Sequence, residues 1–329
     1  MENFYVNGLR KIDVTVSTYD IATGYFSAIG KNTVNKIINK ISPAYLLKQL
    51  NKNLLHFILK KKFDVILIFK GMQLYPETVK YLKQHTAILA NYNPDHPFRF
   101  FSAGSGNKNV LNSIGHYDIY FSYSLQITAQ LNSNFNTTAF TIPFGYDDTL
   151  AVSTNTAEGI NNKILFIGSY DRQRALFLNK IAKEYLYIYG DAKWHSRNVM
   201  LPGIREACQQ RYLYNEEYKQ AVAGAAGIIN LMREQNIIEQ SHNMRTFEVP
   251  GFGGVLISQR TTEQLDFFEE DKEAVYFDSA EELKSKIHFL VNNPAVVSRI
   301  KEAAHQRSVR SEYSYTHRSF QLLQKLKAK

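Results

Sequence analysis

The sequence predicts an α/β protein built of two domains, and three observations support this prediction. Short apolar runs typical of buried strands alternate with amphipathic, helix-like runs along most of the chain. The 329 residues are enough for two domains of ordinary size, each with its own core. Residues 151–162 are rich in Ser, Thr, Asn and Gly, which is typical of a linker.

The first domain is expected to cover residues 1–150. Its predicted strands are short and rich in β-branched and aromatic residues: Val14–Val16, Asp64–Phe69, Ala87–Asn91, Ile119–Tyr123 and Ala139–Ile142. Residues 24–62 are basic and are predicted to be helical in two pieces, with Pro43 at a helix start. The chain begins on a helix, whereas a doubly wound domain usually begins with a strand. We therefore expect the first strand of this domain to be missing.

The second domain is expected to cover residues 163–311. Its predicted strands again share short apolar runs: Lys163–Gly168, Tyr185–Gly190, Gly227–Met232, Val255–Ser258 and Ala274–Phe277. Ser279 and Glu282 form a capping box for the helix that follows the last strand. Residues 312–329 are predicted to form a C-terminal helix.

The stretch from Ser241 to Leu256 is the most informative one in the second domain. It places Glu248 a few residues before Gly253-Gly254, and an apolar run follows, so we predict a short helix, a tight turn and a buried strand. Ligands of parallel sheets bind outside the carboxyl ends of the strands. Glu248 there can accept hydrogen bonds from sugar hydroxyls. The alternative is that Glu248 only caps an ordinary helix.

A second candidate site joins a predicted strand to a helix. The segment from Gly168 to Arg174 combines a glycine turn, Ser169 and an arginine at a helix start, which together can hold phosphate oxygens. It is neither a Walker A loop nor a Gly-x-Gly-x-x-Gly motif. Taken alone, this pattern more often marks a surface arginine.

The loops of the first domain supply further candidates. The proline-containing segment from Tyr92 to Phe98 follows a predicted strand, and Tyr92, Phe98 and Tyr146 are expected to face a ligand cleft. His96 and His242 lie at predicted strand ends, where each is either catalytic or a packing residue.

The chain carries 39 Lys and Arg against 30 Asp and Glu, a formal net charge of +9. This excess allows three interpretations, namely a basic solvated surface, an anionic membrane surface as partner, or nucleic acid. Lysines are dense from Lys31 to Lys62 and again near the C-terminus. We expect no nucleic-acid partner.

Several classes of site lack support. The single cysteine, Cys208, excludes an intrachain disulfide and a cysteine-rich zinc site, and it favours a reducing, cytoplasmic setting. The N-terminus lacks a signal-peptide pattern, and no run of about 18 apolar residues occurs. The nine His are scattered without an Asp-x-Asp triplet, so we expect no bound metal ion, although a substrate-bound magnesium ion stays open.

Several separated stretches, taken together, resemble the CgeB-like glycosyltransferases, a spore-maturation-type family. The resemblance runs from about Asp64 to the end of the chain. The matching pieces are Asn93–Pro97, Pro143–Asp147, Ile167–Tyr170 with Arg174, Tyr189-Gly190 with Trp194, Arg245–Glu248 with Gly253-Gly254, and Tyr315, Arg318 and Leu322. The resemblance implies the GT-B arrangement, in which two Rossmann-like domains face a cleft and a C-terminal helix packs back on the N-terminal domain.

The resemblance also implies roles for single residues. Glu248 would hold the donor ribose, Arg174 the diphosphate, and Gly253-Gly254 would let the chain approach the donor. Residues near Tyr189-Gly190 would border the base, with Gly168, Ser169, His242 and Arg245 completing the donor side. Tyr92, Phe98 and Tyr146 would lie on the acceptor side. Related retaining enzymes carry a second Glu eight positions before the ribose Glu, where this chain has Gln240 beside Glu239.

The resulting prediction is a glycosyltransferase that moves a sugar, in hexosyl transfer, from a nucleotide diphosphate donor, a UDP-sugar by preference, to an acceptor hydroxyl. Arg174 would stabilise the departing diphosphate, and Asp95 or His96 would act as base. No cofactor or metal is expected. The acceptor would be a glycan, a lipid-linked molecule or a protein, met in the cytoplasm or at the inner face of the membrane. The alternative is a non-catalytic protein that binds polysaccharide or nucleic acid through its basic surface.

Overall fold

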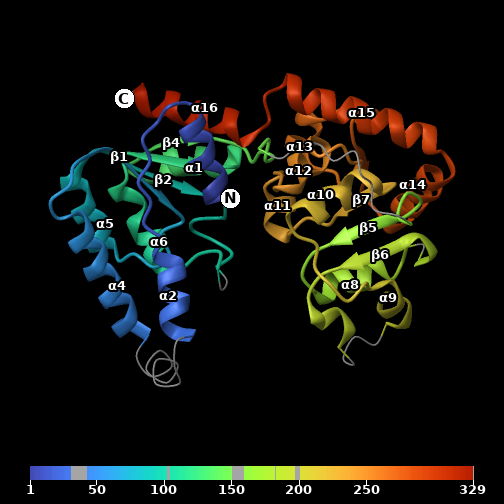
Figure 1. Cartoon of the computed structure of the whole chain (residues 1–329), viewed down its shortest axis with the longest axis horizontal. Coiled ribbons are helices and arrows are strands. Elements are labelled where there is room, and N and C mark those ends of the chain that lie inside the picture. The colour runs from blue at the N-terminus through green and yellow to red at the C-terminus, as the bar shows by residue number, and fades with distance from the viewer. Residues whose placement is uncertain (31–42, 102–103, 150–158, 182, 197–200, 329) are drawn as a thin grey trace. The chain divides into compact units, whose positions relative to one another are not determined.

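The computed structural model describes residues 1–30, 43–101, 104–149, 159–181, 183–196 and 201–328. The chain divides into two compact units (Figure 1), which we call unit 1 (Met1–Pro143 with Ser319–Lys329) and unit 2 (Phe144–Arg318). Most of the predicted linker, residues 151–158, lies outside the described residues.

Unit 1 holds a four-stranded parallel sheet in the order β1-β2-β3-β4. The strands are β1 (Phe63–Phe69), β2 (Thr86–Asn93), β3 (Ile119–Ser122) and β4 (Thr138–Thr141). The helices are α1 (Glu2–Lys11), α2 (Ile21–Gly30), α4 (Pro43–Ile58), α5 (Pro76–Leu82), α6 (Lys108–Ser113) and α7 (Leu125–Asn134), with short 3-10 turns at Lys83–His85 and Ile114–His116. These elements confirm four of the five strands predicted for this half and the helix start at Pro43.

The predicted strand at Val14–Val16 is wrong. The described chain leaves α1 through a turn at Asp13, whose φ of 60° is left-handed, and the amide of Val14 bonds back to the carbonyl of Leu9. A three-residue run forms a strand only where a neighbouring strand takes up its backbone groups. Here the first backbone amide of the run, that of Val14, is already hydrogen-bonded to the end of α1.

Unit 2 holds a five-stranded parallel sheet in the order β6-β5-β7-β8-β9. The strands are β5 (Ile164–Ile167), β6 (Leu186–Tyr189), β7 (Gly227–Asn230), β8 (Leu256–Gln259) and β9 (Val275–Phe277). The helices are α8 (Arg172–Leu178), α9 (Pro202–Ala207), α10 (Asn215–Gly224), α11 (Glu234–Ile238), α12 (Arg245–Gly251), α13 (Thr262–Phe267), α14 (Ala280–Asn292) and α15 (Pro294–Arg310), with 3-10 turns at Lys183–Tyr185 and Ala192–His195.

The stretch around Glu248 folds as predicted. The chain leaves β7, forms α11 and α12, turns at Gly253 with a φ of 75°, and enters β8, which pairs with β7 in parallel. The strand–helix–strand unit is thereby confirmed. The capping box is confirmed in half, since Ser279 Oγ accepts from the amide of Glu282, but the Glu282 carboxylate accepts from the amide of Asp278 instead.

The last helix, α16 (Tyr315–Lys327), packs back on unit 1 as predicted. Ser319 Oγ donates to the carbonyl of Tyr5 in α1 at 3.4 Å, and Lys325 Nζ lies 5.2 Å from the centre of the Phe140 ring in β4. Figure 1 shows α16 beside α1 and β4.

Candidate functional site

The sheet of unit 2 changes direction at β5. The chain passes from β5 to its neighbour β6, and then to β7 on the other side of β5. In open parallel sheets, ligands bind at such a reversal, outside the carboxyl ends of the strands. The loops after β5, β6 and β7 are therefore where a ligand site is expected.

The loops after β5 and β6 are joined by hydrogen bonds. Gly168 donates its amide to the carbonyl of Tyr189 at 2.8 Å, and the carbonyl of Gly168 accepts from Trp194 Nε1 at 2.9 Å. A Cβ on Gly190 would lie 2.1 Å from that carbonyl oxygen, so a larger residue would push the loops apart. The structure thus brings Gly168, Tyr189 and Gly190 together, and Ser169 follows as an exposed residue.

At the start of α8, the backbone amides are less available to an anion than the arginine side chains are. Asp171 is the N-cap, and its carboxylate accepts from the amides of Gln173 at 2.9 Å and Arg174 at 3.1 Å. Those two amides are therefore already satisfied. A phosphate at this edge would meet the side chain of Arg174 instead.

Three arginines converge at the reversal point. Arg174 Nη2 donates to the carbonyl of Leu231, just after β7, at 3.3 Å, and Arg245 Nη2 donates to the carbonyl of Ile167 at the end of β5. Burial lowers the pKa of Arg174, and the nearby charges of Arg245 and Arg233 lower it further. In the described part of the chain, the buried Nε of Arg245 has no hydrogen-bond partner. Neighbouring guanidinium groups repel one another, so an anion between them would be strongly stabilised.

Glu248 lies beside these cations. It stands three residues after Arg245 in α12, so both side chains leave the same face of the helix. Its carboxylate accepts a 3.4 Å hydrogen bond from the Tyr218 hydroxyl of α10. Burial raises the pKa of Glu248, while Arg245 and Tyr218 oppose that rise. A half-buried carboxylate next to a cation cluster can accept hydrogen bonds from ligand hydroxyls.

Arg233 and Tyr218 also belong to this site and were not predicted from the sequence. Arg233 follows β7 by three residues, so the rule that ligands gather at strand ends would have found it. Tyr218 gives no such signal, because it lies in the middle of α10 and reaches Glu248 only through packing. Burial, together with the charge of Glu248, raises the pKa of Tyr218, so the hydroxyl stays protonated and donates.

His242 is fully buried, and both of its ring nitrogens are engaged. Nδ1 lies 2.6 Å from a Glu263 carboxylate oxygen, and Nε2 accepts from the amide of Phe144 at 3.4 Å. Burial lowers the pKa of His242, so the neutral ring carries its proton on Nδ1. This geometry favours the packing role, and contact with a donor stays a prediction.

The glycine pair after α12 has a local structural role. Gly253 has a left-handed φ of 75°, and a Cβ on Gly254 would lie 2.6 Å from Val222 Cγ1 and 2.8 Å from the Val222 carbonyl oxygen. Gly254 therefore lets this turn pack against α10. An approach of the pair to a donor stays a prediction.

The two predicted bases lie in the loop after β2 of unit 1. The Asp95 carboxylate forms a 2.8 Å ion pair with Lys70. His96 is buried, and its Nδ1 accepts from the amides of Phe98 and Arg99 at 3.4 and 3.0 Å. Nδ1 of His96 is therefore already engaged as an acceptor. The role of either residue as base stays a prediction.

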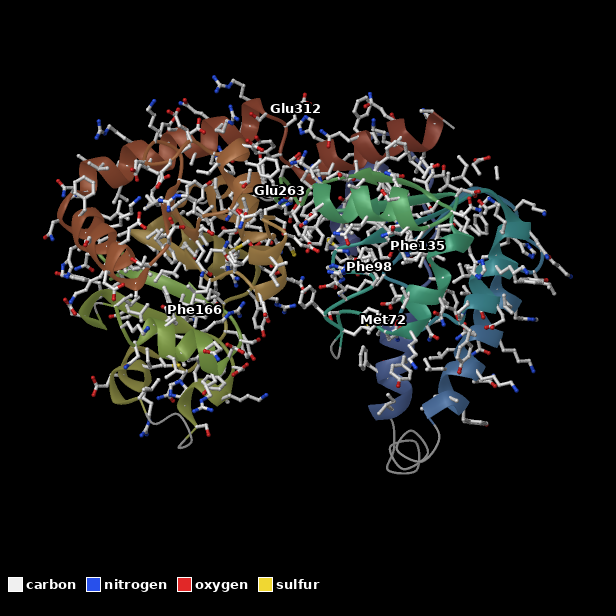
Figure 2. The ribbon with its side chains drawn as sticks, turned by 180° about the vertical axis from the view of Figure 1, so that it is seen from behind. Met72, Phe98, Phe135, Phe166, Glu263 and Glu312 are labelled. Carbon is white, nitrogen blue, oxygen red and sulfur yellow. The ribbon has the colours of Figure 1, made fainter. Side chains whose placement is uncertain are left out.

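The predicted acceptor-side aromatics have different surroundings. The placement of Tyr92 in a loop is wrong, because β2 continues to Asn93. Tyr92 pairs with Phe121 of β3, and its hydroxyl donates to the carbonyl of Ile142 within the core. Phe98 is half-buried against Phe135, with ring centres 5.8 Å apart (Figure 2). Tyr146 belongs to unit 2, where it packs on Gly251 of α12.

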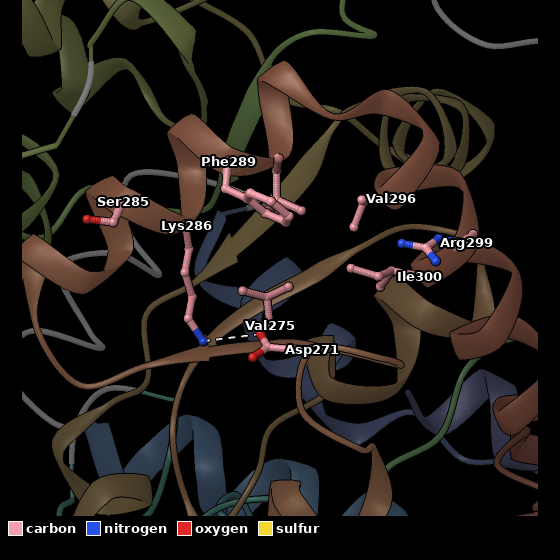
Figure 3. Close-up of a pocket in the computed structure, with 9 residues that line it drawn as sticks. Asp271, Val275, Ser285, Lys286, Phe289, Val296, Arg299 and Ile300 are labelled. Atoms are coloured by element: carbon pink, nitrogen blue, oxygen red, sulfur yellow. Dashed lines mark hydrogen bonds and ion pairs between the residues drawn. The ribbon is translucent and has the colours of Figure 1, made fainter.

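A cavity of about 490 Å³ lies elsewhere in unit 2, between β9, α14 and α15 (Figure 3). Its walls are largely apolar, and the ion pair of Lys286 with Asp271 spans 3.2 Å at one side. None of the predicted site residues lines it. We therefore do not identify this cavity with the predicted donor site.

Within the described residues, no group of three or more His, Cys, Asp or Glu is arranged to hold a metal ion. Likewise, no helix of the described chain is long and apolar enough to cross a membrane.

Solved structures show which fold this is. The chain resembles a mutant of S. aureus TarM in complex with Fondaparinux, alpha-GlcNAc-glycerol and UDP (TM-score 0.60, 14% identity, 84% of this chain and 58% of that one). It also resembles sucrose-phosphate synthase from Thermosynechococcus elongatus (0.61, 12%, 86% and 78%) and a UDP-N-acetylglucosamine 2-epimerase (0.51, 14%, 85% and 77%). The fold is therefore an α/β, GT-B-type fold of two Rossmann-like units, as predicted. The chain spans little more than half of the TarM chain.

Most of unit 2 and part of the last helix also resemble a known family in sequence. Residues 172–324 match the model of the family described as glycosyl transferase-like. That segment begins at α8 and contains Arg174, Arg233, Arg245 and Glu248. The comparison with curated proteins gives no match.

Proposed function

We propose that this protein is a glycosyltransferase that binds a nucleoside diphosphate sugar in unit 2 and transfers the sugar to an acceptor hydroxyl. The observation that carries the proposal is the cluster of Arg174, Arg245 and Glu248 at the sheet reversal. The glycosyl transferase-like family match over residues 172–324 supports it. We further propose membership of the CgeB-like family and independence from metal.

The chemistry assigned to each residue follows from charge. In the transfer, the bond between the sugar and the diphosphate breaks while a bond to the acceptor oxygen forms, so negative charge grows on the diphosphate. Arg174 and Arg245 would stabilise that charge in a partly buried site, where electrostatic stabilisation is strongest. Glu248 would accept hydrogen bonds from the two ribose hydroxyls, and the acceptor proton would go to Asp95.

UDP is the nucleotide we propose, because the TarM complex named above contains UDP. A hexosyl donor and a glycan, lipid-linked or protein acceptor complete the proposal, with the cytoplasmic face of a membrane as location. The stereochemical outcome stays open. Gln240, at the position of the second Glu in related retaining enzymes, is exposed and bonds to the carbonyl of Ile237 and to Thr262.

Incubation with a panel of nucleotide sugars tests the proposal. We expect one UDP-sugar to release UDP, with the sugar either transferred or freed with unchanged configuration at C2. A sugar inverted at C2 would identify an epimerase, a reaction that occurs on the same fold. If no nucleotide binds while a polysaccharide or nucleic acid does, the non-catalytic alternative holds.

A further inference from the structure

Helix α4 is fixed to unit 1 by one of its faces. Leu46, Leu54 and Ile58 are buried on this inner face. Asn51, between them, donates to the carbonyl of Gln73 at 2.8 Å and accepts from the amide of Tyr75 at 3.0 Å. These contacts fix the rotation of the helix about its axis, and with it the direction of the opposite face.

The outer face of α4 combines exposed apolar ends with cations between them. It consists of Tyr45, Lys48, Lys52, His56 and the following Leu59, spaced three or four residues apart, so all lie on one stripe about 20 Å long. Tyr45 is 60% exposed and Leu59 52% exposed. Figure 2 shows nitrogen-tipped side chains standing away from this part of unit 1.

The charge around this face has one sign. Residues 21–63 contain eight lysines and no Asp or Glu. Within the described residues, Lys48 and Lys52 form no ion pair, whereas Lys70 and Lys83 elsewhere in unit 1 do. The lysines of α4 are therefore available to an external anion.

We propose that the outer face of α4 docks unit 1 on an anionic lipid bilayer. Lysines on such a helix attract anionic headgroups, while aromatic and leucine side chains enter the interfacial layer. A soluble polyanion would need the cations but would leave the exposed Tyr45 and Leu59 without a partner. The mixture of exposed apolar and basic side chains therefore favours a membrane. This inference does not depend on the proposed transfer reaction.

Vesicle flotation of the full chain tests the proposal, with phosphatidylglycerol–phosphatidylcholine vesicles compared with phosphatidylcholine alone. We expect binding to the anionic vesicles only. The variant Lys48→Glu/Lys52→Glu should lose roughly tenfold or more of that binding. The matched control Lys180→Glu/Lys284→Glu changes two exposed lysines of unit 2 by the same charge and should bind almost normally. Tyr45→Ser/Leu59→Ser should weaken the binding that remains at high salt.

Three results would overturn the proposal. The first is equal recovery on both kinds of vesicle, or no binding to either. The second is equal loss in the two lysine variants, which would assign the effect to net charge rather than to this face. The third is binding of a sulfated oligosaccharide that depends on Lys48 and Lys52 but not on Tyr45 and Leu59, without vesicle binding. UDP affinity, measured separately by calorimetry, should be the same in all these variants.

Discussion

The two units differ in net charge and in how many of their cations form ion pairs. Unit 1 carries 18 Lys and Arg against 7 Asp and Glu, whereas unit 2 carries 21 against 23, so the whole positive excess belongs to unit 1. In unit 2 several cations lie in ion-pair networks, such as Arg260 with Glu270, Asp278 and Glu282. In the two proposals above, the charge of unit 1 serves a large anionic surface, and the arginines of unit 2 serve a defined small anion.

The two sheets also differ in the order of their strands. The described strands of unit 1 follow one another in sequence order, whereas the sheet of unit 2 reverses at β5. A reversal separates the loops on its two sides and leaves space at the carboxyl ends for a ligand. The arginine cluster and Glu248 lie at that reversal. If the proposed nucleotide site is correct, net charge alone does not locate it, because it lies in the more acidic unit.

The largest expected effect is a loss of stability when an alanine replaces Gly190 in the closely packed loops of unit 2. Gly115 of unit 1, which has open space beside it, is the control. Gly190→Ala would force a Cβ to within 2.1 Å of the Gly168 carbonyl oxygen, whereas a Cβ added to Gly115 would meet no atom within 4 Å. We expect Gly190→Ala to lower the free energy of unfolding by about 1–3 kcal/mol. Gly115→Ala should leave it nearly unchanged. Urea titrations of both variants measure this, and equal stabilities would contradict the close packing of these loops.

Glu248→Gln should weaken UDP binding by about tenfold, because one acceptor oxygen becomes a donor and charged hydrogen bonds are worth about 1.5–3 kcal/mol. Since the pKa of Glu248 is raised, wild-type binding should also weaken as the pH falls through that raised value, and the variant should not show this dependence. Calorimetry at several pH values measures both effects. A much lower thermal midpoint with unchanged UDP affinity would instead make Glu248 a helix-capping residue.

Unit 2 should lose stability in mild acid through His242. Its pKa is lowered in the folded state, so below the ordinary value of 6.5 the unfolded chain takes up a proton that the folded chain does not. The stabilisation is therefore present above pH 6.5 and is lost as the pH falls. Urea midpoints at pH 7.5 and 5.5 measure this. If His242→Phe kept the full pH dependence of the wild type, another group would be responsible.

The smallest expected effect is that of Tyr218→Phe. Its hydroxyl contacts Glu248 at 3.4 Å, a long hydrogen bond, so its loss should weaken UDP binding by roughly threefold. The pH at which binding weakens should shift upward, because the hydroxyl favours the ionised carboxylate. A shift in affinity without any shift in this pH would mean that Tyr218 contributes packing alone.

Much of the fold could be predicted from local patterns, because buried strands and capped helices carry their own signals. The strands β1, β5 and β8 and the start of α4 are of this kind. Val14–Val16 has the same composition as a strand but lacks a partner strand, and Tyr92 belongs to the core because β2 continues to pair with β3. Both outcomes depend on neighbours that are distant in the sequence.

In the candidate site, too, positions at strand ends could be predicted from the sequence, whereas contacts between separate helices could not. Arg174 and Glu248 stand beside glycine turns and strand ends, so their positions could be predicted. The proximity of Arg233 to Arg174, and of Tyr218 to Glu248, arises only when separate helices pack. The engagement of both nitrogens of His242 likewise depends on Glu263 and Phe144, which are far from it in the chain.

The most direct test of the account compares two arginines of the same helix. Arg174 is partly buried in the cluster, whereas Arg172, two residues earlier in α8, is exposed. Calorimetric titration with UDP should show an affinity loss of at least tenfold in Arg174→Ala, a clear loss in Arg174→Lys because the planar fork is removed, and none in Arg172→Ala. Unchanged affinity in Arg174→Ala, or the same loss in both alanine variants, would contradict a diphosphate site at the reversal of the unit 2 sheet.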